Sequence, residues 1–219
     1  MLPPPTLHGL PRSVYTRIAR LALEEKSVPY ELEEMEIFGP AGVPAAHLQR
    51  HPFGRIPVLT HGDLTLYETA AICRYVDEAF TGPPLQPASP AGRARMAQVI
   101  GVLDSYAYRP MVWGVFVQRV RIPLNGGAAD EALVASSLAQ ARTALGALAR
   151  IMGRSPWLAG EALSLADLHA YPMLRYFSLA PEGAAAIAEN PTLADWIGRL
   201  AARASVMRTV TVYEEQRAA

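Results

Sequence analysis

Two polar segments stand directly in front of apolar helical patterns, where side chains can reach unpaired backbone donors. Ser13 closes a loop over residues 9–13, and Glu68 with Thr69 precedes an apolar run over residues 70–80. The first turn of a helix carries free N–H groups and the positive end of the helix dipole, and both favour a bound anion. Glu68 can also pair with an amine. The ordinary alternative is that Ser13 and Thr69 only cap their helices, and both interpretations stay open at this point.

The other reactive side chains show no spacing typical of a metal site or a disulfide. Cys73 is the single cysteine, which excludes an intrachain disulfide and any multi-cysteine zinc site. It falls within an apolar helical pattern, where a cysteine usually packs as a small apolar residue. His8, His61 and His169 are scattered along the chain. We therefore expect no metal.

The charges of the chain balance, with 20 Lys and Arg against 20 Asp and Glu in 219 residues. No net positive field attracts nucleic acid or an anionic membrane, so small neutral partners fit better. No run approaches the ~20 apolar residues that a membrane span requires. Prolines at residues 3–5 stand where a signal peptide would carry basic and apolar residues. We expect a soluble protein of the cytoplasm that binds neither nucleic acid nor membrane.

The first half of the chain reads as a mixture of strands and helices. A strand is expected at residues 6–8, a helix from residue 14 to residue 26, and a second strand at 30–37. A loop with one helical turn follows at 38–51, then a hairpin over 56–66 and a helix over 70–80. The order is βαβ-ββα. The charged residues of the first helix are expected on its polar faces: Arg17, Arg20, Glu24 and Glu25.

The second half reads as helices alone. Residues 81–92 contain four prolines and two glycines, which is the sharpest break in the chain. Long helical patterns follow at 93–119, 130–152, 164–177 and 191–203. Ser164 and Asp167 form a capping-box pattern, and Asn190 precedes a proline at a helix start. We expect a first domain over 1–82, a linker over 83–92, and an all-helical domain over 93–219.

Four segments, in their order and spacing, resemble the cytosolic glutathione S-transferase family. They are GLPRSVYTRIARLALEEK at 9–26, HPFGRIPVL at 51–59, LYETAAICRYV at 66–76 and WLAGEALSLADLHAYPML at 157–174. The resemblance is strongest to the serine-using phi group and to bacterial phi-like or theta-like proteins. It implies the glutathione transferase fold: an α/β thioredoxin-like N-terminal domain followed by an all-α C-terminal helical domain. It also implies a homodimer.

The resemblance assigns four residues to the glutathione peptide itself. Pro57 is expected in the cis form, with Ile56 offering its backbone N–H and C=O as a β-strand would. Glu68 pairs with the α-amino group of the γ-glutamyl end. Thr69 supplies its hydroxyl and backbone N–H to the neighbouring carboxylate at a helix start.

The resemblance assigns Ser13 to the glutathione sulfur, with Tyr15 as the alternative hydroxyl. Its O–H would donate a hydrogen bond that favours the thiolate over the thiol. Lowering the thiol pKa by ~2 units corresponds to ~2.7 kcal/mol, a size that one such bond and helix N–H donors can provide.

The glycine end of glutathione is where the sequence departs from the family. Phi-type proteins carry a basic residue before the PFG motif, but residues 39–46 contain none. The local substitutes are His47, Gln49, His51 and Arg55, of which Arg55 is favoured.

The resemblance places the electrophile pocket at Leu10 and at a cluster of aromatic residues in the second half: Tyr106, Tyr108 and Trp113. The alternative for these aromatics is ordinary packing between helices. Phe53 is either an anchor inserted into a partner subunit or a residue buried in its own domain.

The implied activity is attack of the glutathione thiolate on small hydrophobic electrophiles, a detoxification reaction, together with glutathione peroxidase activity. Glutathione is a co-substrate, and no other cofactor is expected. A glutathione-dependent isomerase or dehalogenase on the same fold is an alternative. A non-catalytic ligand-binding protein is another.

Overall fold

The computed structural model describes residues 3–218 and divides into two compact units. One unit is Met1–Leu85 with Ala204–Ala219, and the other is Gln86–Arg203. The sequence pattern places everything from residue 93 onward in one helical domain, whereas Ala204 and the residues after it group with the first unit. The cause is that the helix at Ala204–Arg208 packs on the first helix of the chain, and that Arg17 of that first helix bonds to Glu214.

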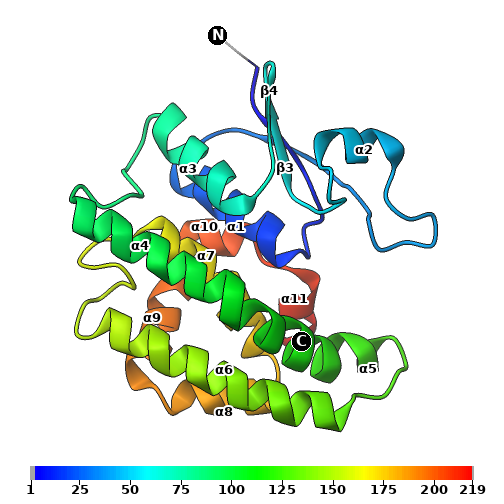
Figure 1. Ribbon diagram of the computed structural model, residues 1–219, viewed down its shortest axis with the longest axis vertical. Helices are drawn as coiled ribbons and strands as arrows, with labels where there is room; N and C mark the ends of the chain where they lie inside the picture. Colours follow the sequence, from blue (N-terminus) through cyan, green and yellow to red (C-terminus); the bar gives the residue numbers. More distant parts are fainter. Residues whose placement is uncertain (1–2, 219) are drawn as a thin grey trace. The chain divides into compact units, whose positions relative to one another are not determined.

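The first unit contains a four-stranded sheet in the order β2-β1-β3-β4. β1 pairs in parallel with β2 and antiparallel with β3, and β3 pairs antiparallel with β4. Figure 1 shows α2 and α3 on opposite sides of the β3 and β4 hairpin. The bounds are β1 (Thr6–His8), β2 (Glu31–Glu33), β3 (Val58–His61), β4 (Leu64–Leu66), α1 (Val14–Glu25), α2 (Ala45–Arg50), α3 (Thr69–Ala79), α10 (Ala204–Arg208) and α11 (Val212–Ala218). The predicted βαβ-ββα order is confirmed.

Helix α1 contributes its apolar face to the core of this unit. Its apolar residues Ile18, Leu21 and Ala22 are fully buried, and the helix packs against α3. Arg17, expected on a polar face, is also fully buried. That prediction is wrong because the last helices of the chain cover this face of α1.

Strand β2 is shorter than predicted. Only Glu31–Glu33 form the strand, and both glutamates are exposed. The strand is at an edge of the sheet, where one side lacks a neighbouring strand to extend the pairing.

The second unit contains helices only (Figure 1). α6 packs along α4 and the two helical segments after it, and α7 packs against α4 and η2. The bounds are α4 (Pro90–Val102), η1 (Leu103–Ala107), η2 (Arg109–Arg121), α5 (Ile122–Leu124), α6 (Glu131–Met152), α7 (Leu165–Phe177), α8 (Pro181–Ala188) and α9 (Pro191–Ala201). Helices α8, α10 and α11 were not predicted, since each has eight residues or fewer.

The segment predicted as one helix over 93–119 changes its hydrogen-bonding pattern partway. η1 and η2 are π-helical, with i to i−5 bonds such as Tyr108 N–H to Leu103 O and Ile122 N–H to Val117 O. Nine of the 13 residues of η2 are buried, so this segment belongs to the core of the helical unit.

The capping box of α7 is formed as predicted. One Asp167 carboxylate oxygen accepts from Ser164 N–H and Oγ–H, both at 2.8 Å. The other accepts from Leu158 N–H and the Trp196 indole, also at 2.8 Å. Burial raises the pKa of Asp167. Asn190 likewise precedes α9 as predicted, but its side chain bonds back to Ala186 O instead of capping.

Candidate active site

Ser13 is the N-cap of α1 and lies at the end of the loop that follows β1. Its Oγ accepts a hydrogen bond from Thr16 N–H at 3.4 Å, and its own N–H donates to Leu10 O at 2.9 Å. A hydroxyl that accepts one bond still has its own hydrogen to donate. The side chain is half-buried, as is that of Tyr15 in the first turn of α1. The capping role of Ser13 therefore leaves its proton available to a ligand.

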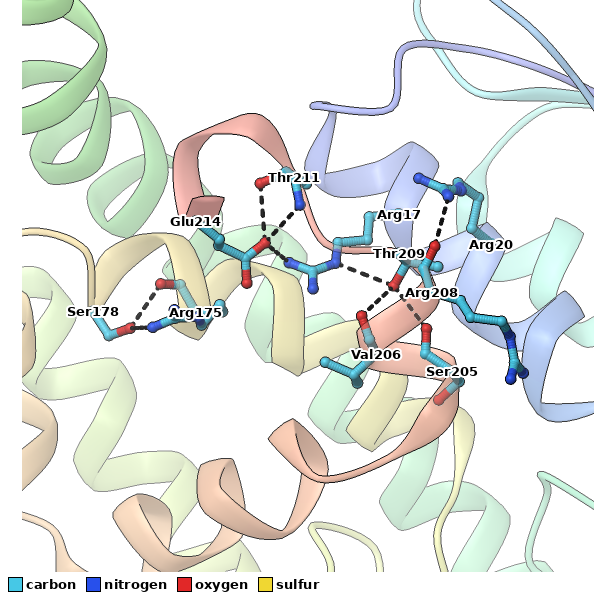
Figure 2. Close-up of polar contacts among 10 residues, drawn as sticks. All are labelled: Arg17, Arg20, Arg175, Ser178, Ser205, Val206, Arg208, Thr209, Thr211 and Glu214. Atoms are coloured by element: carbon cyan, nitrogen blue, oxygen red, sulfur yellow. Dashed lines mark hydrogen bonds and ion pairs between the residues drawn. The ribbon is translucent and has the colours of Figure 1, made fainter. Parts of the chain in front are cut away.

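The turn of α1 that follows Ser13 is held by the end of the chain. The buried Arg17 donates from Nη1 to Glu214 Oε2 at 2.6 Å and from Nε to Thr209 Oγ1 at 3.4 Å (Figure 2). The same Glu214 oxygen accepts from Thr211 N–H at 3.1 Å and from Thr211 Oγ–H at 3.0 Å. Because removing one partner of a buried ion pair is costly, this contact fixes the C-terminal helices to α1.

The Ile56–Pro57 peptide bond is cis, as predicted. The Ile56 side chain is buried with Leu10 and Met35. Pairing of β3 with β1 begins at Val58, so the backbone of Ile56 comes just before the ladder. Leu10 and Ile56 therefore bring the first loop and the cis-proline loop together.

The substitutes considered for the glycine end differ in exposure. His47 and His51 are buried, whereas Gln49 and Arg55 are exposed. His47 Nε2 is 2.7 Å from Arg55 O, and His51 Nδ1 accepts from Phe53 N–H at 3.4 Å. Burial lowers the pKa of His51, against an opposing effect of the Glu68 carboxylate. Both imidazoles hold the loop itself, and Arg55 and Gln49 are left facing solvent.

Glu68 and Thr69 stand at the start of α3. Glu68 has φ 68° and ψ 110°, a conformation that residues with a side chain rarely adopt. Its carbonyl accepts from Ile72 N–H at 3.0 Å, and its side chain is exposed. Thr69 is the first helical residue and is buried. Backbone strain of this kind persists where the structure needs a side chain aimed in a particular direction.

Two of the three predicted pocket aromatics face a cavity inside the helical unit. Tyr106 and Trp113 line a space of about 650 Å³ between the π-helical segments and α6. Tyr108 accepts a hydrogen bond from the Trp113 indole at 3.1 Å. Leu10 belongs to the other unit and packs on Ile56. Of the four predicted pocket residues, the three aromatics therefore belong to the helical unit and Leu10 to the first unit.

Residues 3–218 contain no cluster of three or more His, Cys, Asp or Glu side chains that could hold a metal ion. Over the same residues, no helix is both long and apolar enough to cross a membrane.

Comparison with known proteins decides the family. The model described as glutathione S-transferase, N-terminal domain, matches residues 7–84, and the model for the C-terminal domain matches residues 131–199. Glutathione S-transferase 4 of Zea mays is 32% identical over 197 residues, which cover 90% of this chain and 87% of the relative. The chain belongs to the glutathione S-transferase family.

Solved structures of glutathione S-transferases share this fold. Glutathione S-transferase III in its apo form matches with a TM-score of 0.85 and 30% identity, over 96% of this chain and 97% of the other. Glutathione S-transferase I from maize, in complex with an atrazine glutathione conjugate, matches with a TM-score of 0.82 and 29% identity, over 94% and 96%. The predicted family and fold are confirmed.

Reasoning from the sequence missed the role of Arg17 in this glutathione S-transferase, and it considered His47 only for the glycine end of glutathione. Arg17 follows Ser13 by four residues, and its ion-pair partner Glu214 is 197 residues further along the chain. His47 belongs to the short helix α2 and bonds to the carbonyl next to Ile56. A charged residue one turn after Ser13, next to the apolar Ile18, was the available signal for Arg17.

Proposed function

We propose that this chain ionises the thiol of glutathione and conjugates it to small hydrophobic electrophiles. The observation that supports the proposal is that Ser13, the cis Ile56–Pro57 bond and the Glu68–Thr69 helix start all belong to one compact unit. The maize relative bound to an atrazine glutathione conjugate supports the reaction class.

Thiolate formation is the step in which Ser13 acts. A free thiol with a pKa of about 8.5 is only a few per cent ionised at neutral pH. Donation from Ser13 Oγ–H to sulfur, with the N–H groups of the first turn of α1, stabilises the anion. The thiol proton passes to solvent. The sulfur then forms a bond to the electrophilic carbon, whose leaving group departs or whose π-bond takes up the electron pair, without a covalent enzyme intermediate.

Binding of the peptide falls to the residues around the sheet edge. Ile56 pairs through its backbone with the cysteinyl unit, Glu68 with the α-amino group, and Thr69 with the γ-glutamyl carboxylate. Arg55 is exposed and directly precedes Ile56, which supports it as the partner of the glycine carboxylate. Tyr15 is the alternative hydroxyl for the sulfur, and Leu10 with Tyr106, Tyr108 and Trp113 stays the proposed electrophile pocket.

The test of this function is Ser13→Ala. We expect turnover of a chloronitrobenzene to fall about 100-fold, the scale of losing one donor to a reacting anion. Glutathione affinity, measured by calorimetry, should change less than threefold. The matched control is Ser89→Ala, because Ser89 caps α4 in the same way, accepting from Gly92 N–H at 3.1 Å. Unchanged turnover in Ser13→Ala would remove Ser13 from this role and point to Tyr15.

Titration of the unaltered protein with glutathione separates the enzyme from a ligand carrier. We expect saturable binding in the calorimeter. No heat of binding at millimolar glutathione would overturn the proposed conjugation and leave a protein that holds apolar ligands.

We also propose that two copies pair as a homodimer. Phe53 is 70% exposed, which rules out burial in its own domain. An aromatic side chain this exposed on a loop supports Phe53 as the anchor that a partner subunit would cover. The cytoplasm is the proposed location, consistent with Cys73 being a free buried thiol.

A further inference from the structure

His47 is a fully buried imidazole beneath the loop that carries Ile56. Its Nε2 is 2.7 Å from the carbonyl oxygen of Arg55. A carbonyl oxygen can only accept, so Nε2 carries the hydrogen and donates it. Within the described residues 3–218, Nδ1 is buried without a hydrogen-bond partner. The ring therefore makes a single polar contact, and that contact is with the loop.

The carbonyl that His47 holds belongs to the same peptide group as the N–H of Ile56. A peptide group is planar and Ile56 follows Arg55 directly, so fixing the C=O direction also fixes the N–H direction. A hydrogen bond to the carbonyl also polarises the N–H, which strengthens the hydrogen bond that this N–H donates by roughly 10–30%. The imidazole of His47 therefore influences the Ile56 N–H through the Arg55–Ile56 peptide group, although it contacts only the carbonyl oxygen on the opposite side of that group.

Backbone bonds already hold the rest of this loop. His51 N–H donates to His47 O at 2.8 Å, and Gly54 N–H donates to His51 O at 2.9 Å. These bonds shape the path of residues 51–54 without fixing the 55–56 peptide. An apolar side chain at position 47 would fill the same buried space with no unpaired nitrogen. The polar imidazole is therefore explained by the one bond that it makes.

We propose that His47 is a positioning residue for glutathione, aiming and polarising the Ile56 N–H toward the cysteinyl carbonyl of the ligand. This inference rests on the proposed glutathione-binding role of Ile56. It concerns affinity for one atom of the ligand, and the sulfur chemistry at Ser13 is separate from it.

The test compares two thiols in calorimetric titrations of the full chain. Glutathione has the cysteinyl carbonyl and the glycine, and γ-glutamylcysteamine lacks both; the exposed Arg55 side chain proposed for the glycine carboxylate is unchanged in the variants. In His47→Phe, which keeps the ring and loses the donor, we expect the Kd for glutathione to rise about fivefold to tenfold, in line with the loss of one hydrogen bond. The Kd for γ-glutamylcysteamine should change less than twofold. Turnover at saturating glutathione should stay within twofold of the unaltered protein.

Two further variants sharpen the test. His47→Gln restores an amide donor near Arg55 O and should recover glutathione affinity to within about threefold. His61→Phe is the matched control, because His61 belongs to the same unit and bonds to Tyr75 Oη at 2.7 Å. It should bind both thiols as the unaltered protein does.

Each contrary outcome has a distinct meaning. Equal weakening of both thiols in His47→Phe would show a general structural role and overturn the inference. Unchanged glutathione affinity in that variant would overturn it as well, while leaving the proposed function intact. Failure of the unaltered protein to bind glutathione would overturn the proposed function and the inference together.

Discussion

Glu68 combines an exposed carboxylate with a positive φ of 68°. Non-glycine residues in sparsely populated backbone regions store about 1–3 kcal/mol of strain. Glycine has no Cβ and adopts such a conformation freely. Substitutions at this position can therefore separate the effect of backbone strain on stability from the effect of the carboxylate on glutathione binding.

Glu68→Gly should raise stability by up to about 1 kcal/mol because it relieves this strain. The same change should weaken glutathione binding at least tenfold, since the partner of the α-amino group is lost. Glu68→Gln should weaken binding without raising stability. Urea unfolding and calorimetry of both variants measure the two effects. Equal affinity in all three proteins would contradict the assignment of Glu68.

His51 should make the protein sensitive to mild acid. Burial lowers its pKa below the usual 6.5, so between the lowered value and 6.5 the unfolded chain binds a proton that the folded chain does not. The contribution of His51 to the free energy of unfolding is therefore fully present above pH 6.5. It falls as the pH decreases through this window, by at most about 1.4 kcal/mol per pH unit.

The measurement is urea unfolding at pH 7.5 and pH 5.5, followed by circular dichroism. His51→Asn retains an acceptor near Phe53 N–H but cannot titrate, so it should lose less stability on acidification than the unaltered protein. His8, whose pKa burial also lowers, leaves part of the dependence in both. Identical losses in the two proteins would remove His51 as a source.

The structural roles of residues inside local motifs could be predicted from the sequence. The roles of residues that depend on distant contacts could not. The capping role of Ser13 follows from the residues next to it, and the cis form of Pro57 was predicted from the resemblance of residues 51–59 to the family. The burial of Arg17 depends on Glu214, almost the whole chain away. The bond from His47 to Arg55 depends on how α2 packs under its own loop, which helical spacing does not encode.

Among elements, the π-helical segment η2 approaches α6 closely at Gly114. A Cβ on Gly114 would overlap the Cβ and Oγ of Ser137 on α6. Gly114→Ala should therefore destabilise the protein by about 1–3 kcal/mol through overpacking. Ser137→Gly in the same chain removes the obstructing atoms and should restore most of the packing.

The control for this pair is Gly146→Ala in α6, where a Cβ would meet no atom within 4 Å. That change should stabilise the helix by about 0.5–1 kcal/mol. Thermal unfolding measures all three variants, with about 2–4 °C expected per kcal/mol for a chain of this size. A neutral Gly114→Ala would show that η2 and α6 are not packed as closely as described.

Long elements with clear periodicity could be predicted, and short or irregular ones could not. α1, α3, α6 and α7 follow from apolar spacing and caps. The prediction of 93–119 rested on a long run without strand alternation, and such a run does not distinguish π-helical turns from α-helical ones. α8, α10 and α11 are too short for a period to emerge, and their stability comes from packing.

At the scale of the whole molecule, the last helices belong to the first unit even though they follow the helical one. The ion pair of Arg17 with Glu214 is buried on both sides, and the ion pair of Arg208 with Glu24 also joins the last helices to α1. A prediction that divides the sequence into consecutive domains cannot anticipate that the last helices pack in the first unit. The order of the two family domains was nevertheless predictable, since each carries its own motif.

The state of assembly provides a prediction that involves two molecules. Phe53→Asp should convert the proposed dimer to a monomer, because a charge at an aromatic anchor would have to be buried unpaired against the partner subunit. Phe38→Asp is the matched control, since Phe38 is also exposed in the first unit, at 52%. Sedimentation velocity should show a dimer for the unaltered protein and for Phe38→Asp. A dimer that survives Phe53→Asp would place the interface elsewhere, and a monomeric unaltered protein would overturn the proposed pairing.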